Sequence, residues 1–170
     1  MEMKHTLSVI VENKPGVLAR TAGLFRRRGF NIDSLAVGVT ENPKISRMTI
    51  VVEGDQRVLD QVMKQVNKLI EVIKVGYLED EESVGRELAL IKVNADQKTR
   101  SEIMQIVDIF RARIIDVAPN SLIVEVTGDE NKINAMSQLL KQFGIKEMVR
   151  TGKVALQRGE KTLIVEEEID

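Results

Sequence analysis

The sequence contains no cysteine among its 170 residues. This absence excludes disulfide bonds, a thiolate nucleophile and cysteine metal ligands, and it suits a reducing cytoplasm. Tryptophan is also absent, and aromatic residues make up only 3% of the chain, with Tyr77 as the single tyrosine. Proteins that bind single-stranded nucleic acid stack its bases on aromatic side chains, so no nucleic-acid partner is expected.

Histidine is equally scarce, since His5 is the only one. It lies in the strand-like stretch HTLSVIV and alternates there with Leu7 and Val9. No pair of nucleophile and general base can be built around it from the sequence. We therefore expect a surface or edge-strand histidine and no catalytic residue.

Neither charge dominates, and long apolar runs are missing. The 25 basic and 26 acidic residues give a net charge of -1, and the sequence pI is ≈ 6.0. This balance argues against a general polyanion binder. The opening MEMKHT does not resemble a secretion signal, and no apolar run is long enough to cross a bilayer. A cytoplasmic protein that does not associate with membranes is expected.

A repeat becomes visible when two Gly-Asp pairs are aligned. The stretch MTIVVEGDQRVLDQVMKQVNKL (48–69) matches LIVEVTGDENKINAMSQLLKQF (122–143). Each copy contains a β-branched strand, the Gly-Asp pair, and a helix whose apolar residues are three and four apart. Because a short carboxylate can accept from the first helix amides, Asp55 and Asp129 are predicted N-caps.

The segments before these copies also correspond. LFRRRGFNIDSLAV (24–37) and IFRARIIDVAP (109–119) each pass from a basic helix end into a strand. Gly29 is predicted to end its helix, which places Arg26–Arg28 at the negative end of the helix dipole; a docking patch is the alternative. With the strands HTLSVIV, EVIKVGYL, ELALIKVNA and IKEMVRTGKVAL, each half reads strand-helix-strand-strand-helix-strand. The prediction is an α+β fold of two tandem ferredoxin-like βαββαβ sandwiches.

The acidic stretch EDEESVGRE lies between the two halves and lacks apolar periodicity. It predicts a first domain over 1–78, a linker over 79–86 and a second domain over 87–158. Residues 159–170 contain TLIV, which can form a short strand, but they end in charge. This tail is expected to be loosely held.

Each half is small for a core of its own, and its helices would cover only one face of its sheet. The strands MTIVVE and LIVEV carry apolar side chains on both faces, more than a half-exposed sheet requires. Pairing of sheet faces or edges with another copy is therefore expected. A homodimer is the simplest closed arrangement.

The junction ENKPGVL (12–18) has the chemistry of a ligand site. The first amides of a helix have no internal acceptor and attract an α-carboxylate. Pro15 fixes the backbone near the first turn, and Gly16 has no Cβ to block a ligand. Asn13 can cap the helix or hold both the ammonium and the carboxylate of an amino acid. The alternative is an ordinary strand-to-helix turn.

A second neutral amide, Asn31, begins the next strand at the end of the sandwich where the first helix finishes. The alternative role for Asn31 is that of a helix-to-strand turn residue. The two asparagines could face one another across a dimer seam, with Val17, Leu18 and Ile32 lining the walls. Such a pocket would favour a small aliphatic side chain.

The stretch LSVIVENKPGVLARTAGLFRRRGFNIDSLAVGVTENPKISRMTIVVEGD resembles the N-terminal ACT domain of the small regulatory subunit of acetohydroxyacid synthase, or acetolactate synthase. DIFRARIIDVAPNSLIVEVTG and RTGKVALQRG resemble the C-terminal domain of that family. The resemblance covers about residues 3–160. It implies an ACT domain followed by an ACT-like domain.

The resemblance also implies a function. Members carry no catalysis or cofactor; they bind and activate a thiamine-diphosphate-dependent catalytic subunit and confer feedback inhibition by valine or another branched-chain amino acid. The effector lies between two ACT domains of a dimer. The family's effector-site residues fall on Asn13, Gly16 and Asn31, with Ile32 beside the last. Pro15 stands where some members have serine, which should stiffen the loop.

Two other classes of protein can be built on such repeats. A stand-alone ACT-type amino-acid sensor or transcription regulator would need a DNA-reading helix-turn-helix, and no such pattern flanks the repeats. An enzyme would need a metal cluster, a phosphate loop or a nucleophile triad, and no such motif appears. The sequence leaves open which branched-chain amino acid is preferred, whether feedback is retained, and which surface meets the catalytic subunit.

Overall fold

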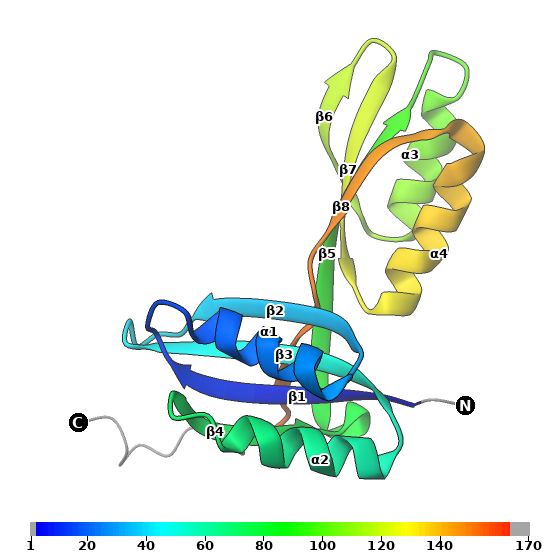
Figure 1. Cartoon of the computed structure of the whole chain (residues 1–170). Coiled ribbons are helices and arrows are strands. Elements are labelled where there is room, and N and C mark those ends of the chain that lie inside the picture. The colour runs from blue at the N-terminus through cyan, green and yellow to red at the C-terminus, as the bar shows by residue number, and fades with distance from the viewer. Residues whose placement is uncertain (1–2, 164–170) are drawn as a thin grey trace. The chain divides into compact units, whose positions relative to one another are not determined.

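The computed structural model describes residues 3–163 and divides them into two units. The first unit comprises residues 3–84 and 153–163, and the second comprises residues 85–152. Each unit contains an antiparallel sheet with two helices on one face (Figure 1). The predicted α+β fold of two ferredoxin-like sandwiches is confirmed.

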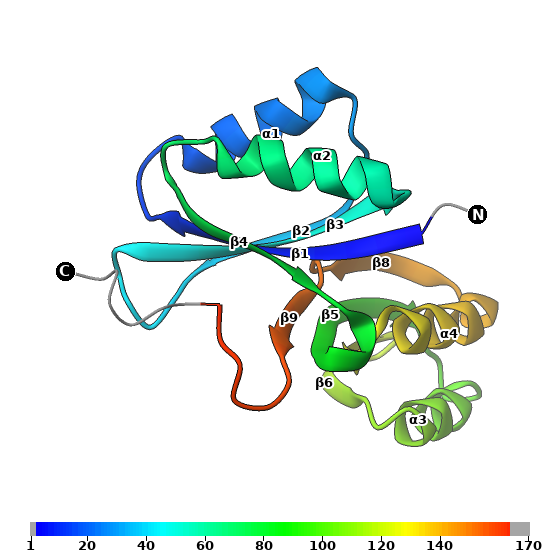
Figure 2. The same ribbon diagram turned by 90° about the horizontal axis from the view of Figure 1, so that it is seen from below.

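The first unit has the strand order β2-β3-β1-β4, so β2 and β4 are its edge strands. Helices α1 and α2 form a layer on one side of this sheet, and β9 lies on the other side (Figure 2). The elements are β1 (Met3–Glu12), α1 (Val17–Arg28), β2 (Ile32–Val39), β3 (Ile45–Gly54), α2 (Gln56–Asn67), β4 (Val72–Leu78), the 3-10 turn η1 (Asp80–Glu82) and β9 (Val154–Gln157).

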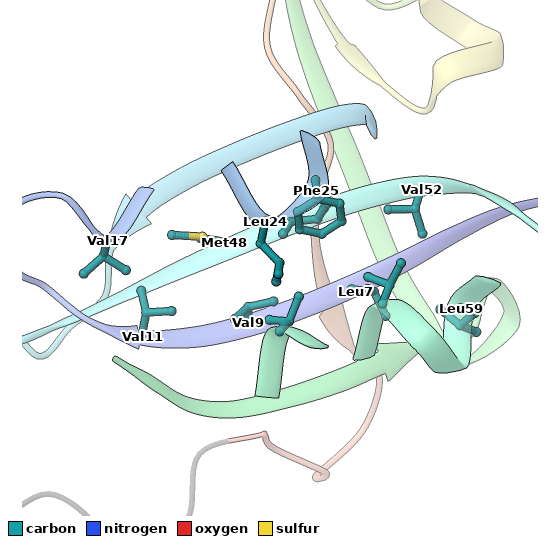
Figure 3. Close-up of a cluster of buried hydrophobic side chains, with 12 residues drawn as sticks. Leu7, Val9, Val11, Val17, Leu24, Phe25, Met48, Val52 and Leu59 are labelled. Carbon is teal, nitrogen blue, oxygen red and sulfur yellow. The ribbon is translucent and has the colours of Figure 1, made fainter. Parts of the chain in front are cut away.

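The core of the first unit lies between the sheet and the two helices. Alternate residues of β1 point into it, because side chains alternate across a strand, and Val9 pairs with Met48 on β3. Figure 3 shows these side chains facing Leu24 and Phe25 of α1. Burying each large apolar side chain contributes about 1.5–3 kcal/mol. This core fixes α1, and with it the β1–α1 corner, on the sheet.

The second unit repeats the arrangement, with the strand order β6-β7-β5-β8. Ala89, Ile91 and Val93 of β5 pack against the helices in its core. The elements are β5 (Ser83–Asn94), α3 (Arg100–Ile109), β6 (Arg113–Ala118), β7 (Ser121–Gly128), α4 (Glu130–Leu140), the 3-10 turn η2 (Lys141–Phe143) and β8 (Ile145–Arg150).

The predicted helix ends are confirmed. Asp55 accepts from the Val58 amide at 3.0 Å, and Asp129 accepts from the Lys132 amide at 2.8 Å. Gly29 ends α1 in a left-handed conformation, with φ 69°, where a residue without Cβ is favoured. The three arginines before it form the last turn of α1.

The C-terminal end of the second domain differs from the prediction. IKEMVRTGKVAL is not one strand, because residues 151–153 interrupt it and separate β8 from β9. The second unit ends at Gly152, and residues 153–158, predicted for the second domain, join the first unit. Residues 80–86, predicted as linker, form η1 and the start of β5. Of the predicted tail, 164–170 lie outside the described residues.

Part of the second face of the first sheet is covered by the same chain, since the Lys153 amide donates to the Ser34 hydroxyl there. Pairing of a sheet face or edge with another copy stays a prediction. One further expectation is wrong. His5 is neither on the surface nor on an edge, since β1 lies between β3 and β4. Its ring is buried, and its Nε2 donates to the Gly54 carbonyl at 3.0 Å. Among residues 3–163, no helix is long and apolar enough to cross a membrane.

Candidate functional site

The turn between β1 and α1 depends on Gly16, which is the N-cap of α1. Its φ of 83° and ψ of -7° lie in the left-handed region, which disfavours residues with a Cβ. A Cβ there would also lie 2.9 Å from a guanidinium nitrogen of Arg20. The sequence pointed to this glycine as a place for close approach, and the backbone supplies an additional reason for it.

Gly16 has no side chain to cap the helix, so the first amides of α1 lack an internal acceptor. Within residues 3–163, no acceptor lies within hydrogen-bond reach of the Leu18 and Ala19 amides. Pro15 is exposed and lies in the turn, two residues before the helix begins at Val17. These free amides, at the positive end of the helix dipole, can receive a carboxylate.

Asn13 does not cap the helix. Its Nδ2 donates to the Pro43 carbonyl at 2.9 Å, and its backbone amide donates to the Lys44 carbonyl at 2.7 Å. These bonds tie Asn13 to the turn between β2 and β3. Its side-chain oxygen, Oδ1, has no partner within residues 3–163, so it can accept from an ammonium group.

Two ion pairs surround the same corner. Arg20 of α1 pairs with Glu71, and Lys14 pairs with Glu12 at 2.9 Å. The pKa of Glu71 is lowered, first by a hydrogen bond from its own amide and then by Arg20. The hydrogen bond to Glu12 raises the pKa of Lys14. A ligand carboxylate at Gly16 would therefore approach the side chains of Lys14 and Arg20, which Glu12 and Glu71 hold at this corner.

Arg20 was not found by sequence reasoning. Its spacing of four residues from Gly16 was the available signal, because residues i and i+4 share a helix face. Its partner Glu71 is distant in the sequence and precedes β4. Only the fold brings the two together.

Asn31 lies at the opposite end of the sheet from Asn13. Its side chain donates to Glu53 at 3.1 Å, and its carbonyl accepts from the Glu53 amide. Asn13 bonds instead to Lys44, which precedes Glu53 by nine residues along the chain. At about 3.3 Å per strand residue, the two asparagines of one chain are about 30 Å apart. One chain therefore cannot place both on a single small ligand.

The apolar residues proposed for the pocket walls have different surroundings. Val17 is 4% exposed and points into the core, as Figure 3 shows. Ile32 is half-buried and packs against that core. Leu18 is 45% exposed, so its side chain is available for contact. On the edge strand β2, Val37 and Val39 are exposed as well.

The equivalent corner of the second unit carries its own carboxylate. Asp96, just after β5, accepts from the amides of Lys98 at 2.8 Å and Thr99 at 2.9 Å. The Thr99 hydroxyl also donates to it. Asp96 thus closes the turn that precedes α3, and the first amides of α3, like those of α1, have no side-chain cap among residues 3–163.

The stability of the second unit is expected to depend on pH through Asp96. Hydrogen bonds from the amides of Thr99 and Lys98 lower its pKa below 3.8. Because the folded pKa is depressed, its stabilisation is complete above the ordinary carboxyl pKa and is lost as the pH falls through the folded value. Urea unfolding can be measured from about pH 7 to about pH 3. The free energy of unfolding of Asp96→Asn should be lower than that of wild type at neutral pH, and this difference should shrink as the pH falls. A gap independent of pH would contradict this role.

Comparisons with known proteins cover both units. Residues 7–74 match the AHAS small subunit-like ACT domain, and residues 86–159 match a family described as the small subunit of acetolactate synthase. A probable acetolactate synthase small subunit of Archaeoglobus fulgidus is 64% identical over 94% of this chain and 99% of its own. The acetolactate synthase small subunit of Mycobacterium bovis is 58% identical over 91% and 92%. The crystal structure of the small subunit from Thermotoga maritima matches with a TM-score of 0.88 and 46% identity, over 94% of this chain and 99% of that one.

Proposed function

The chain belongs to the family of acetolactate synthase small subunits, and we propose that it is a non-catalytic regulator that activates the catalytic subunit and confers feedback inhibition by a branched-chain amino acid. In this proposal its partner is the catalytic subunit of acetolactate synthase. The resemblance implies that this catalytic subunit depends on thiamine diphosphate. The first unit is the ACT domain, and in this proposal it binds the effector. The second unit contributes to activation.

The proposal rests on the placement of the two asparagines at opposite ends of one sheet, beside the edge strand β2, whose outer edge is unpaired in the described part of the chain. Within residues 3–163, β2 pairs with β3 only. A second copy that paired its β2 across a two-fold axis would run antiparallel to the first. The start of the partner's β2 would then lie beside the end of the first copy's β2, at Val39.

This pairing brings the two half-sites together. The segment after Val39 leads to the Pro43 and Lys44 carbonyls that hold Asn13. The partner's Asn31, just before β2, would therefore arrive at the β1–α1 corner. The exposed Val37 and Val39 support pairing at this edge, because exposed apolar edge strands are ready templates for another strand.

The ligand chemistry follows from the completed corner. The free amides beside Gly16 receive the α-carboxylate, and the oxygen of Asn13 accepts from the α-ammonium. The exposed Leu18 side chain offers an apolar contact for an aliphatic side chain. Valine, leucine and isoleucine each have an α-carboxylate, an α-ammonium and an aliphatic side chain. The corner is proposed to bind one of them at each end of the dimer seam.

Reconstitution tests the proposal. The purified chain alone should show no acetolactate synthase activity, and adding it to its catalytic subunit should raise that subunit's activity. Valine, leucine or isoleucine should then lower the activity, and at about one hundred times its dissociation constant the effector should stabilise the chain by about 2.7 kcal/mol in a thermal-shift assay. No rise in activity on mixing would contradict activation, and no response to any of the three amino acids would contradict feedback.

A further inference from the structure

The chain leaves the first unit after Val84 and re-enters it at Lys153, so two covalent connections join the second unit to the effector domain. The re-entering residues, 153–163, are called here the return segment. Within the first unit, β9 of this segment lies on the sheet face opposite α1 and α2 (Figure 2). The segment is thus part of the effector domain and also the direct continuation of the second unit.

Specific bonds hold the return segment on the sheet. The Lys153 amide donates to the Ser34 hydroxyl on β2 at 2.8 Å, and the Lys153 ammonium donates to the Thr6 hydroxyl on β1 at 3.0 Å. Arg47 on β3 donates to the Ala155 carbonyl at 3.4 Å. Three strands of the sheet therefore contact this one segment.

The sheet is shaped to receive another backbone on this face. Gly76, Ser8, Thr49 and Ala36 are paired in register across β4, β1, β3 and β2. Such small residues allow close backbone approach. A Cβ on Gly76 would lie 2.5 Å from Leu163 of the return segment, so the segment uses the room that the glycine leaves.

The same face also contains groups that favour release of the segment. Ser8 is fully buried, and within the described residues neither its hydroxyl nor the Nε of Arg47 has a hydrogen-bond partner. Burial lowers the pKa of Arg47, an effect that nearby Glu41 partly offsets. Unpaired buried polar groups regain water when their cover lifts. The docked state is therefore less stable than it would be if these groups were paired.

Ser34 links the return segment to the effector site. It lies on β2 three residues after Asn31 and two after Ile32, on the edge strand proposed to pair with a second copy. A ligand that moves β2 also moves the Ser34 hydroxyl, which accepts from the Lys153 amide. Residue 152, next in the chain, already belongs to the second unit.

We propose that the return segment is the coupling element through which effector binding at the β1–α1 corner reaches the second unit, with Ser34 and Lys153 as its positioning residues. The inference rests on the proposed function. The segment has a docked and a lifted state, and the effector favours one of them because it fixes β2. Such a ligand acts only by a difference in its affinity for the two states.

The test measures coupling instead of inhibition alone. By linkage, if the amino acid changes the affinity of the chain for the catalytic subunit, binding of that subunit must change the amino acid's affinity by the same factor. Calorimetry would give the valine dissociation constant for the chain alone and for the assembled enzyme. The ratio of these two constants measures the coupling, and allosteric ratios are typically about 5- to 150-fold. The variants are Ser34→Ala and Lys153→Met, and Lys161→Met is a matched control at an exposed position of the same segment.

We expect the wild type and Lys161→Met to show the same ratio, clearly different from one. Ser34→Ala and Lys153→Met should bring the ratio close to one, while the dissociation constant of the chain alone stays within about twofold of wild type. A preserved ratio in both variants would overturn the inference and leave the proposed function intact. A ratio of one in the wild type would overturn this inference, whereas the proposed feedback fails only if valine, leucine and isoleucine all leave the activity of the reconstituted enzyme unchanged.

Discussion

Gly16→Asp is expected to abolish inhibition by branched-chain amino acids while the chain still activates the catalytic subunit. The new carboxylate would lie beside the free amides of α1, where the ligand's carboxylate has to bind. Two unit charges 4 Å apart repel by about 4 kcal/mol at an effective dielectric constant of about 20. That repulsion corresponds to more than about a hundredfold loss of affinity. The measurement is an inhibition curve of the reconstituted enzyme with each amino acid.

The matched control is Gly16→Asn, which has the same size and no charge. Gly16 is left-handed, with φ 83°, so both variants carry the same backbone strain, about 1 kcal/mol, and asparagine and aspartate tolerate this region best among residues with a Cβ. A cost of that size leaves a domain folded. Full sensitivity in the aspartate variant would show that the carboxylate binds elsewhere. Loss of activation in both variants would show that the turn itself had failed.

Asn13→Ala and Asn31→Ala are each expected to weaken effector binding strongly. Each loses an amide that can bond a charged group of the ligand, and such bonds contribute about 1.5–3 kcal/mol. The affinity should fall about ten- to a hundredfold, measured by calorimetry on the chain alone. Asn67→Ala, at the exposed end of α2, is a control for a surface asparagine and should bind as wild type does. Wild-type affinity in either site variant would remove that residue from the site.

The fold could be predicted from the sequence where local chemistry determines it. The Gly-Asp repeat located two helix starts, and Asp55 and Asp129 cap them as their short side chains allow. Gly29 ends α1 for an equally local reason. The break between β8 and β9 could not be predicted in this way, because residues 145–156 carry strand-forming residues on both sides of Gly152. The destination of the second half depends on contacts with Ser34 and Thr6, far away in the sequence.

The candidate site was predictable to a similar extent. Asn13, Pro15 and Gly16 are neighbours in the sequence, so their turn could be located before the fold was known. Their relation to Asn31 depends on the register of β1 and β2 on β3, which is a long-range property. That register separates the two asparagines within one chain, and it is the reason that the proposed site needs two copies.

The central claim, that each effector site combines Asn13 of one copy with Asn31 of the other, is tested most directly with mixed dimers. Chains carrying Asn13→Ala and chains carrying Asn31→Ala would be produced together with different tags, and dimers containing one of each would be purified. If the site is shared, one of the two effector sites of such a dimer retains both asparagines. Calorimetry should then find one effector bound per mixed dimer at wild-type affinity, compared with two for the wild type. A mixed dimer that binds no effector, while the wild type binds two, would contradict the shared site, because both asparagines would then have to come from the same chain.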